Sequence, residues 1–255
     1  MYNYQDFSYT TLLEGMTSIS ALIHGRDQGI NDRPIYAVLI DENKKRSKYR
    51  EIGYLRAMSE KLNFSVLFVP SDHIEDLVQG STHGGIVALC GDRSFRDCTN
   101  IPDYGFWVLS EGVEDPFNLG FTLRSLYASG VDGVLLQKHN CMCAAGVVSK
   151  SSAGTSEMLD IRECDSESAV QAFKQAGYRI VCAGIRDSVN IYQANLKKPL
   201  LLVIGGEKRG ISRSVLDQAD QIVRIDYGRN FNGSLTAASA ATVIAFEVLH
   251  QNCLQ

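Results

Sequence analysis

The sequence lacks the segments that mark membrane-inserted and secreted proteins. No apolar run approaches the ~20 residues that a helix needs to span a bilayer. The first residues, from Met1 to Asp6, contain no positively charged region followed by an apolar core, so no secretory signal is predicted. We therefore expect a cytoplasmic protein that does not contact a membrane.

The seven cysteines follow no metal-binding or disulfide pattern. They are odd in number and scattered, and the one close pair, Cys141 and Cys143, is not a CxxC motif. No Cys/His pair elsewhere supplies a second half-site. We predict reduced thiols and no metal.

Three common motifs of catalytic and nucleotide-binding sites are also absent. There is no G-x-G-x-x-G after a strand, no P-loop and no G-x-S-x-G elbow. The five histidines form no motif with a serine or cysteine nucleophile. His83 lies in a Thr-His-Gly-Gly-Ile turn before a strand, where an RNA contact and a turn-stabilising role are equally supported.

Basic residues are not in excess. Lys and Arg number 25 against 29 Asp and Glu, which gives a formal net charge of −4. Non-specific nucleic-acid binding depends on basic surface, so the composition argues against it but leaves room for a local patch. The densest basic run spans residues 44–50, with Arg56 beyond it. An RNA-binding patch and a solvated helix face explain this run equally well.

Strand and helix patterns alternate along the 255 residues, which predicts βαβ units, a mainly parallel sheet and the α/β class. The periodicity breaks between Gly91 and Tyr104, so we place a domain boundary there and expect domains at 1–103 and 104–255. We expect strands at 35–40, 64–69, 85–90, 105–110, 133–137, 178–183, 200–205 and 222–226, and helices at 10–24, 43–62, 71–78, 116–129, 141–150, 167–176, 213–219 and 234–250.

Three strand ends of the second domain lead to small and polar residues. The strand at 200–205 runs into Gly205, Gly206 and Glu207, the strand at 105–110 leads to Asn118, and the strand at 222–226 leads to Ser234. Ligands of α/β sheets bind at the carboxyl ends of the strands. The two glycines would let the chain pass close to a ligand. The sequence therefore predicts a ligand crevice at these strand ends.

Together these motifs resemble the TrmH/SpoU family of the SPOUT superfamily, which are S-adenosylmethionine-dependent RNA ribose 2′-O-methyltransferases. The matching residues are Asn118, Gly120 and Arg124 in a first motif, Gly205, Gly206, Glu207 and Gly210 in a second, and Ser234 and Leu235 in a third. The resemblance runs from about Phe106 to about Leu249. In one departure, Thr236 stands where the family usually has Asn. A fainter likeness around 83–88 is to a ribosomal-protein-like RNA-binding domain.

The resemblance implies an RNA substrate-binding domain at 1–103 and a SPOUT domain at 104–255 that contains a deep trefoil knot. It also implies a homodimer, with the site near the subunit interface, that methylates a ribose 2′-hydroxyl in rRNA or tRNA. The implied catalytic residues are Asn118, Arg124, Glu207 and Ser234. The implied S-adenosylmethionine-binding residues are Ala183, Gly184, Ile204, Gly205, Gly206, Glu207, Gly210, Ile225, Ser234, Leu235 and Thr236.

Arg124 is the residue most closely tied to the chemistry. A guanidinium is a poor base, but its planar fork can clamp a phosphate and stabilise a developing alkoxide. Two alternatives stay open. Thr236 and the acidic balance suit an RNA-binding protein that has lost catalysis, and a base-directed RNA methyltransferase is the other.

Overall fold

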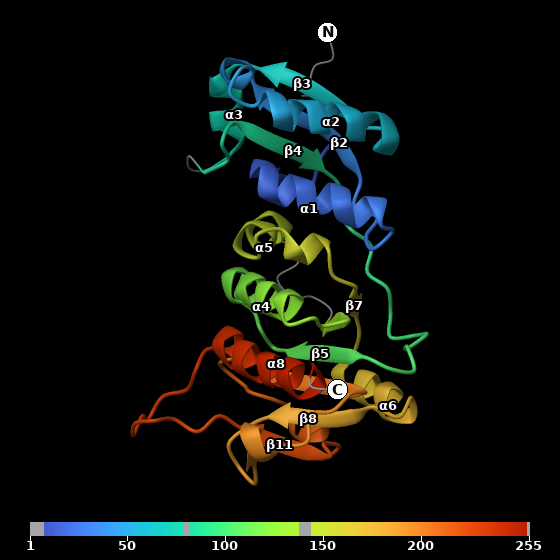
Figure 1. The fold of residues 1–255 in the computed structure, drawn as a ribbon, viewed down its shortest axis with the longest axis vertical. Coiled ribbons are helices and arrows are strands. Elements are labelled where there is room, and N and C mark those ends of the chain that lie inside the picture. Colours follow the sequence, from blue (N-terminus) through green and yellow to red (C-terminus); the bar gives the residue numbers. More distant parts are fainter. Residues whose placement is uncertain (1–7, 79–81, 138–143, 254–255) are drawn as a thin grey trace. The chain divides into compact units, whose positions relative to one another are not determined.

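The computed structural model describes residues 8–78, 82–137 and 144–253. The chain divides into two compact units, each with its own sheet (Figure 1). The N-terminal unit comprises residues 1–94 and 144–158, and the C-terminal unit comprises 95–143 and 159–255. The α/β class predicted from the alternation of strands and helices is confirmed.

The N-terminal unit contains a four-stranded sheet in the order β1-β4-β2-β3. Its elements are β1 (Thr11–Glu14), α1 (Gly15–Asp27), β2 (Ile35–Asp41), η2 (Glu42–Lys44), α2 (Tyr49–Leu62), β3 (Ser65–Val69), α3 (Ser71–Leu77), β4 (Ile86–Cys90), α5 (Ala145–Ser151) and η4 (Thr155–Glu157). β2 and β3 are parallel, whereas β4 is antiparallel to both β1 and β2. The apolar run of β2 is buried because residues of α1 and α2 cover one face of the sheet and residues of α3 cover the other.

Two predicted helices of this unit are shorter in the structure. Residues 11–14 lie within the predicted helix 10–24 but form β1, which pairs with β4. The helix begins only at Gly15, whose φ of 78° is rarely adopted by other residues. Likewise, α2 begins at Tyr49, not near residue 43. Pairing with a distant strand thus overrides the helical spacing of the first segment.

Residues 144–158 pack with the N-terminal unit, although they fall inside the predicted second domain. Within this unit, α5 contacts β1, and η4 contacts α1. Glycine permits the second contact, because a Cβ on Gly25 would lie 2.0 Å from the carbonyl oxygen of Glu157. The structural division therefore differs from the predicted boundary at 103/104: the first unit ends at Ser94 and regains a segment from later in the chain.

A buried ion pair holds this segment in the N-terminal unit. Arg33 Nε lies 3.1 Å from Glu157 Oε2, and the two side chains are 2% and 0% exposed. Arg33 also donates to the carbonyl oxygen of Gly91 at 2.9 Å, and Asn31 Nδ2 donates to the carbonyl oxygen of Glu157 at 2.6 Å. Two buried charges are tolerated only when each has a partner.

The C-terminal unit contains a seven-stranded sheet in the order β7-β6-β5-β10-β8-β11-β9, and all its neighbouring strands are parallel. Its elements are β5 (Phe106–Glu111), α4 (Pro116–Ala128), β6 (Gly133–Leu136), β7 (Ile161–Glu163), α6 (Ser166–Gln175), β8 (Arg179–Ala183), β9 (Val189–Asn190), η5 (Ile191–Gln193), β10 (Leu200–Gly205), α7 (Arg213–Leu216), β11 (Gln221–Arg224) and α8 (Ala237–Cys253). The short strands β7 and β9 were not predicted.

Helices cover the central strands of this sheet. α4 and α8 pack against each other (Figure 1), and α8 also contacts β10. Residues of α6 and α7 cover a cluster that includes Trp107, Leu201 and Val203 from the strands. The carboxyl ends of β5 and β10, at Glu111 and Gly205, lie side by side. The deep trefoil knot stays a prediction from the family resemblance. No helix in the described ranges is both long and apolar enough to cross a membrane.

We predict that Glu157→Leu lowers the free energy of unfolding by about 3–5 kcal/mol, because it leaves the Arg33 charge buried without its partner. Chemical denaturation of the purified chain measures the change. Arg33→Met combined with Glu157→Leu should restore part of the loss, since neither charge is then buried. The exposed pair Lys208–Glu114 provides the control, and Glu114→Ala should leave stability unchanged. A Glu157→Leu protein as stable as the parent would contradict the assigned role of the ion pair.

Candidate functional site

A cavity of about 620 Å³ opens at the carboxyl ends of β8, β10 and β11 in the C-terminal unit. Its volume lies in the range of roughly 300–1,000 Å³ that is typical of small-molecule sites. The walls are mostly small and apolar, with a few charged groups at Arg186, Glu207, Arg224 and Asp226. The lining residues are Ala183, Gly184, Ile185, Arg186, Ile204, Gly205, Gly206, Glu207, Gly210, Ile211, Leu216, Val223, Arg224, Ile225, Asp226, Tyr227, Phe231, Gly233, Ser234, Leu235, Ala237, Ala240 and Ile244.

The glycine loop after β10 is closed by its own backbone. The Gly206 N–H donates to the carbonyl oxygen of Glu111 at 2.6 Å, and the Gly210 N–H donates to the carbonyl oxygen of Gly206 at 3.0 Å. A Cβ on Gly206 would lie 1.9 Å from the carbonyl oxygen of Gly112, and one on Gly205 would lie 2.4 Å from the carbonyl carbon of Gly210. The sequence interpretation attributed these glycines to the approach of a ligand. The structure shows that the chain itself already requires both.

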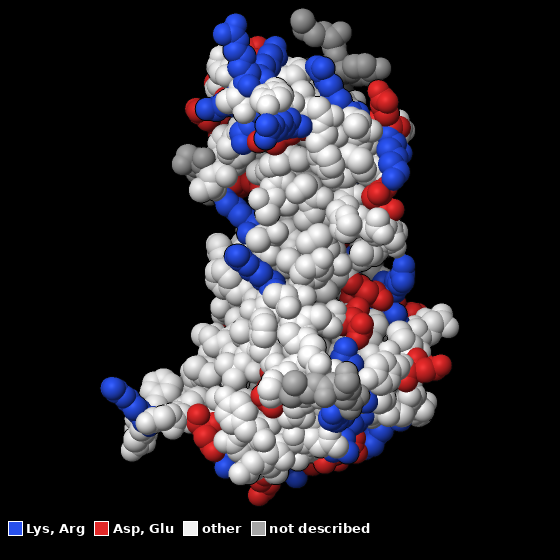
Figure 2. All heavy atoms as spheres, viewed as in Figure 1, with Lys and Arg blue, Asp and Glu red and all other residues white. Residues whose placement is uncertain are grey.

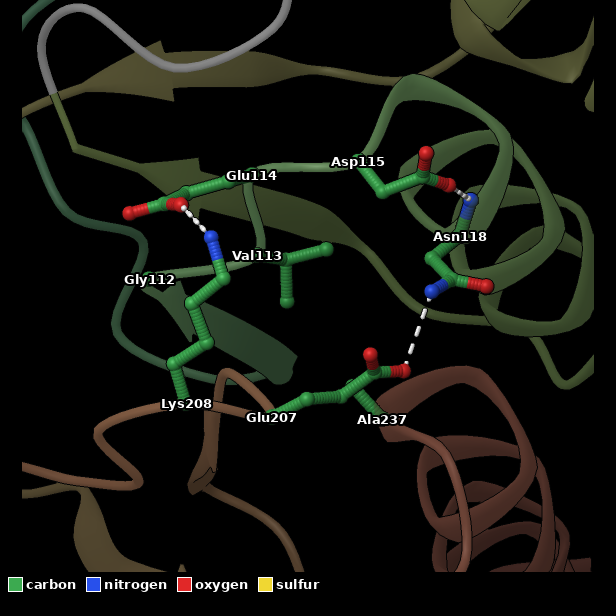
Figure 3. A pocket seen from close by; sticks show the side chains of 8 residues that line it. All are labelled: Gly112, Val113, Glu114, Asp115, Asn118, Glu207, Lys208 and Ala237. Carbon is green, nitrogen blue, oxygen red and sulfur yellow. Dashed lines mark hydrogen bonds and ion pairs between the residues drawn. The ribbon is translucent and has the colours of Figure 1, made fainter.

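A smaller cavity of about 90 Å³ shares Glu207 and Ala237 with the larger one (Figure 3). The Asn118 side chain points at Glu207, and its Nδ2 donates to Glu207 Oε1 at 3.0 Å. Asp115 caps α4 by accepting the Asn118 N–H at 2.8 Å, with proline in the first turn of the helix. Because Asp115 performs the capping, the Asn118 amide is available to orient the Glu207 carboxylate.

An ion pair lies at the rim of the smaller cavity. Lys208 Nζ is 3.1 Å from Glu114 Oε2, and the two side chains are 81% and 63% exposed. The hydrogen bond and positive charge of Lys208 hold the pKa of the Glu114 carboxyl below its ordinary value. The charge of Lys208 is therefore already paired within this protein, whereas Glu207 is paired with a neutral amide.

Thr236 caps α8. Its Oγ1 accepts the Ser239 N–H at 3.2 Å, and its carbonyl oxygen accepts the Ala240 N–H at 3.0 Å. Threonine is an accepted N-cap residue, although asparagine is somewhat preferred. The departure from the family pattern at position 236 therefore preserves the start of the helix, and Ser234 and Leu235 before it still line the larger cavity.

The structure brings most of the predicted site residues together. Every predicted cofactor-binding residue except Thr236 lines the larger cavity, and Ser234 lines it as well. Arg124 lines neither cavity but is exposed on α4. It follows Asn118 by six residues, which places it about 240° around the helix. Within one chain, the structure does not bring Arg124 to Asn118 and Glu207.

Several lining residues were missed by the sequence analysis, notably Arg186, Asp226, Tyr227, Phe231 and Ala240. Tyr227 and Phe231 could have been found from the sequence, because they are two aromatic residues that shortly precede the predicted Gly233-Ser234 turn.

The Asp226 carboxylate at the edge of the larger cavity is already held in place. It accepts hydrogen bonds from Asn190 Nδ2 at 2.5 Å and from Arg224 Nε at 2.7 Å. These two contacts hold the pKa of Asp226 below its ordinary value, with the Asn190 bond as the larger cause.

Two further sequence hypotheses concerned histidine and cysteine. His83 Nδ1 accepts the Gly85 N–H at 3.1 Å, so His83 does stabilise its turn. Cys141 and Cys143 lie outside the described residues. Among the residues that are described, no three His, Cys, Asp or Glu side chains gather as metal ligands.

The chain is similar in sequence and in fold to RNA methyltransferases. Residues 105–246 match the SpoU rRNA Methylase family. A protein of Staphylococcus saprophyticus assigned to the TrmH family of tRNA/rRNA methyltransferases is 30% identical over 230 residues, which are 87% of this chain and 90% of that protein.

Two solved structures share the fold. The SpoU methyltransferase AviRb from Streptomyces viridochromogenes, in complex with the cofactor AdoMet, has a TM-score of 0.74 at 23% identity and covers 94% of this chain and 89% of its own. An RNA 2′-O ribose methyltransferase also has a TM-score of 0.74, at 22% identity, and covers 94% of this chain and 88% of its own.

We predict that Gly206→Ala destabilises the protein by about 1–3 kcal/mol, because the added methyl overlaps the backbone of Gly112. Gly228→Ala is the matched control, since a Cβ there meets nothing within 4 Å. Urea denaturation of the two variants tests the difference. Equal stability of the two variants would show that the loop relaxes away from the contact.

Proposed function

The chain belongs to the SpoU rRNA Methylase family, and on that premise we propose that it transfers a methyl group from S-adenosylmethionine to a ribose 2′-hydroxyl of rRNA or tRNA. The observation that carries the proposal is the cavity at the ends of β8, β10 and β11, which brings together the residues of the second and third motifs. The Asn118–Glu207 bond adds the first motif beside it.

The larger cavity suits S-adenosylmethionine. Ile204, Ile225 and Leu235 offer apolar walls, and the glycines leave backbone close to the lumen. When bound, the cofactor supplies a methyl group that its sulfonium has already activated, so the chain must chiefly bind, align and exclude water. A site made largely of backbone and small residues is sufficient for this task.

Glu207 is the residue that we propose to position the ribose. Its carboxylate lines both cavities and is oriented by the Asn118 amide. A carboxylate accepts hydrogen bonds, so it can hold a ribose hydroxyl in line with a methyl donor in the larger cavity. Ser234, on the wall of the same cavity, offers a second hydroxyl contact.

The N-terminal unit offers a surface for the RNA backbone. The residues of the basic run 44–50 are exposed apart from half-buried Lys48, and Figure 2 shows Lys and Arg side chains gathered over the region of α2. Lys45 Nζ lies 4.6 Å from the ring centroid of Phe68, and the guanidinium of Arg56 lies 5.8 Å from it. Phe68 itself is half-buried, and the exposed cations beside it suit the phosphates of an RNA backbone. This local patch supports RNA binding despite the net charge of −4.

We also propose a homodimer, in which the exposed face of α4 is covered by a second copy of the chain. Phe117 and Phe121 are 55% and 48% exposed one helical turn apart, and Phe246 of the neighbouring α8 is 43% exposed. Arg124 continues the α4 stripe, three residues after Phe121. Because it lines neither cavity of its own chain, we propose that it reaches the site of the partner subunit.

We predict that purified protein incorporates labelled methyl groups from S-adenosylmethionine into rRNA or tRNA, with 2′-O-methylated nucleosides as the product. Arg124→Ala should lower the rate by about 10²–10³-fold, because a preorganised charge at the reacting group is lost. Single-turnover methylation measures the rate.

Titration with S-adenosylhomocysteine is the control for this variant and should give an unchanged affinity. Arg124→Lys should recover only part of the rate, since an ammonium lacks the planar fork. Product in the form of methylated bases would show a base-directed enzyme. Binding of RNA without any methylation would show the inactive alternative.

We predict a dimer in sedimentation experiments, at twice the chain mass of 28.1 kDa. Phe121→Glu should produce monomers by placing a charge in the apolar interface, whereas Tyr192→Glu should not, although Tyr192 is 69% exposed. A monomeric parent protein would refute the dimer.

A mixing experiment tests whether Arg124 acts across the interface. Ala240→Phe should block the larger cavity, and Arg124→Ala removes the cation. Co-refolded mixtures of these two inactive variants should regain activity, because half of the sites in a mixed dimer then have both an open cavity and a partner arginine. Inactive mixtures would show that Arg124 serves its own chain.

A further inference from the structure

The loop between β11 and α8 projects from the C-terminal unit (Figure 1). All of its residues from 226 to 234 are exposed. Two of them, Tyr227 and Phe231, nevertheless line the larger cavity while remaining 39% and 56% exposed. Large aromatic side chains at the mouth of a cavity present flat apolar surface both to solvent and to whatever enters.

Both rings are held in place without being buried. Their centroids are 5.7 Å apart, with an interplanar angle of 57°. The Tyr227 hydroxyl accepts the Leu235 N–H at 3.1 Å, which ties the first ring to the far end of the loop. Phe231 lies against the backbone of Gly233, since a Cβ there would be 2.4 Å from Phe231 Cζ. The loop therefore preorganises two exposed rings.

The charge pattern of the loop favours RNA as its ligand. Arg229 is exposed on the same loop, two residues before Phe231, and no acidic residue occurs between Asp226 and Glu247. Aromatic rings interleaved with cations bind single-stranded nucleic acid, because bases stack on the rings while phosphates contact the cations. Ala183, Gly184, Ile204, Gly205 and Gly206 line the same cavity and are less exposed than the two rings, so they remain available to hold the cofactor.

We propose that Phe231 and Tyr227 form the platform on which the base of the target nucleotide stacks, with Arg229 contacting the adjacent RNA backbone. This assignment rests on the proposed RNA methyl transfer and extends it, because it names the element that positions the nucleotide beside the cofactor. Stacking is tolerant of base identity, so the platform contributes affinity and orientation and leaves base selection to other contacts.

The test compares RNA and cofactor binding for the same variants. Phe231→Ala should lower kcat/KM for bulk rRNA or tRNA about tenfold or more, and should weaken binding of a fluorescein-labelled single-stranded RNA to a similar extent. The Kd for S-adenosylhomocysteine should stay within about twofold of the parent value. Phe231→Trp should retain RNA binding, since it keeps a stacking surface.

Gly233→Ala provides an independent variant, because it displaces the Phe231 ring while leaving every aromatic residue present. It should reproduce the RNA defect of Phe231→Ala. Tyr192→Ala is the matched control, since Tyr192 is exposed in the same unit but lines neither cavity, and it should behave as the parent.

Three outcomes would overturn the platform: unchanged RNA binding by Phe231→Ala, an equal loss of RNA and S-adenosylhomocysteine affinity, or an equal defect in Tyr192→Ala. The second outcome would place the ring in the cofactor subsite. If the parent protein methylates no RNA, the proposed function is wrong. The binding of labelled RNA by Phe231→Ala still tests the stacking platform independently of methylation.

Discussion

The close approach of Gly206 to the carbonyl oxygen of Gly112 is the constraint on which the site depends. It joins the loop after β10 to the loop after β5, with room for no Cβ at position 206. Glu207 comes directly after Gly206 in the first loop, and Asn118 lies on α4, which follows the second loop. The hydrogen bond between their side chains holds the carboxylate where it lines both cavities. The position of the carboxylate thus depends on backbone packing and on the Asn118 amide.

A second constraint links the two units through the chain itself. The buried contact between Arg33 and Glu157 returns residues 144–158 to the N-terminal unit after the chain has already formed β5, α4 and β6 of the C-terminal one. The chain therefore passes between units three times, and neither unit is one continuous segment. The ion pair therefore stabilises the unit that is proposed to bind RNA. One of its two residues, Glu157, is separated by only a few residues from β7 of the other unit.

The proposed recognition of RNA is divided by chemistry between the two units. The N-terminal unit offers charge, through the basic run at 44–50 and the cations beside Phe68. The C-terminal unit offers aromatic surface at the mouth of a cavity, through Tyr227 and Phe231. An acidic chain can bind RNA in this way, because phosphate attraction needs only a local patch and stacking needs no net charge.

The sequence by itself determined the α/β class, the positions of the strongly apolar strands such as 35–40 and 200–205, and the family, because periodicity and short motifs are local properties of the chain. It also placed all but one of the predicted cofactor-binding residues correctly on the wall of the larger cavity at the ends of β8, β10 and β11, although it missed other lining residues such as Arg186, Tyr227 and Phe231. Only the tertiary structure showed that residues 11–14 form a strand, that 144–158 return to the first unit, that Gly206 is required by the backbone of Gly112, and that Arg124 lines neither cavity of its chain. Each of these depends on a contact between segments that are distant in sequence or on the direction of a helix face. A local sequence pattern indicates that a residue is buried, but it does not identify the residues that pack against it.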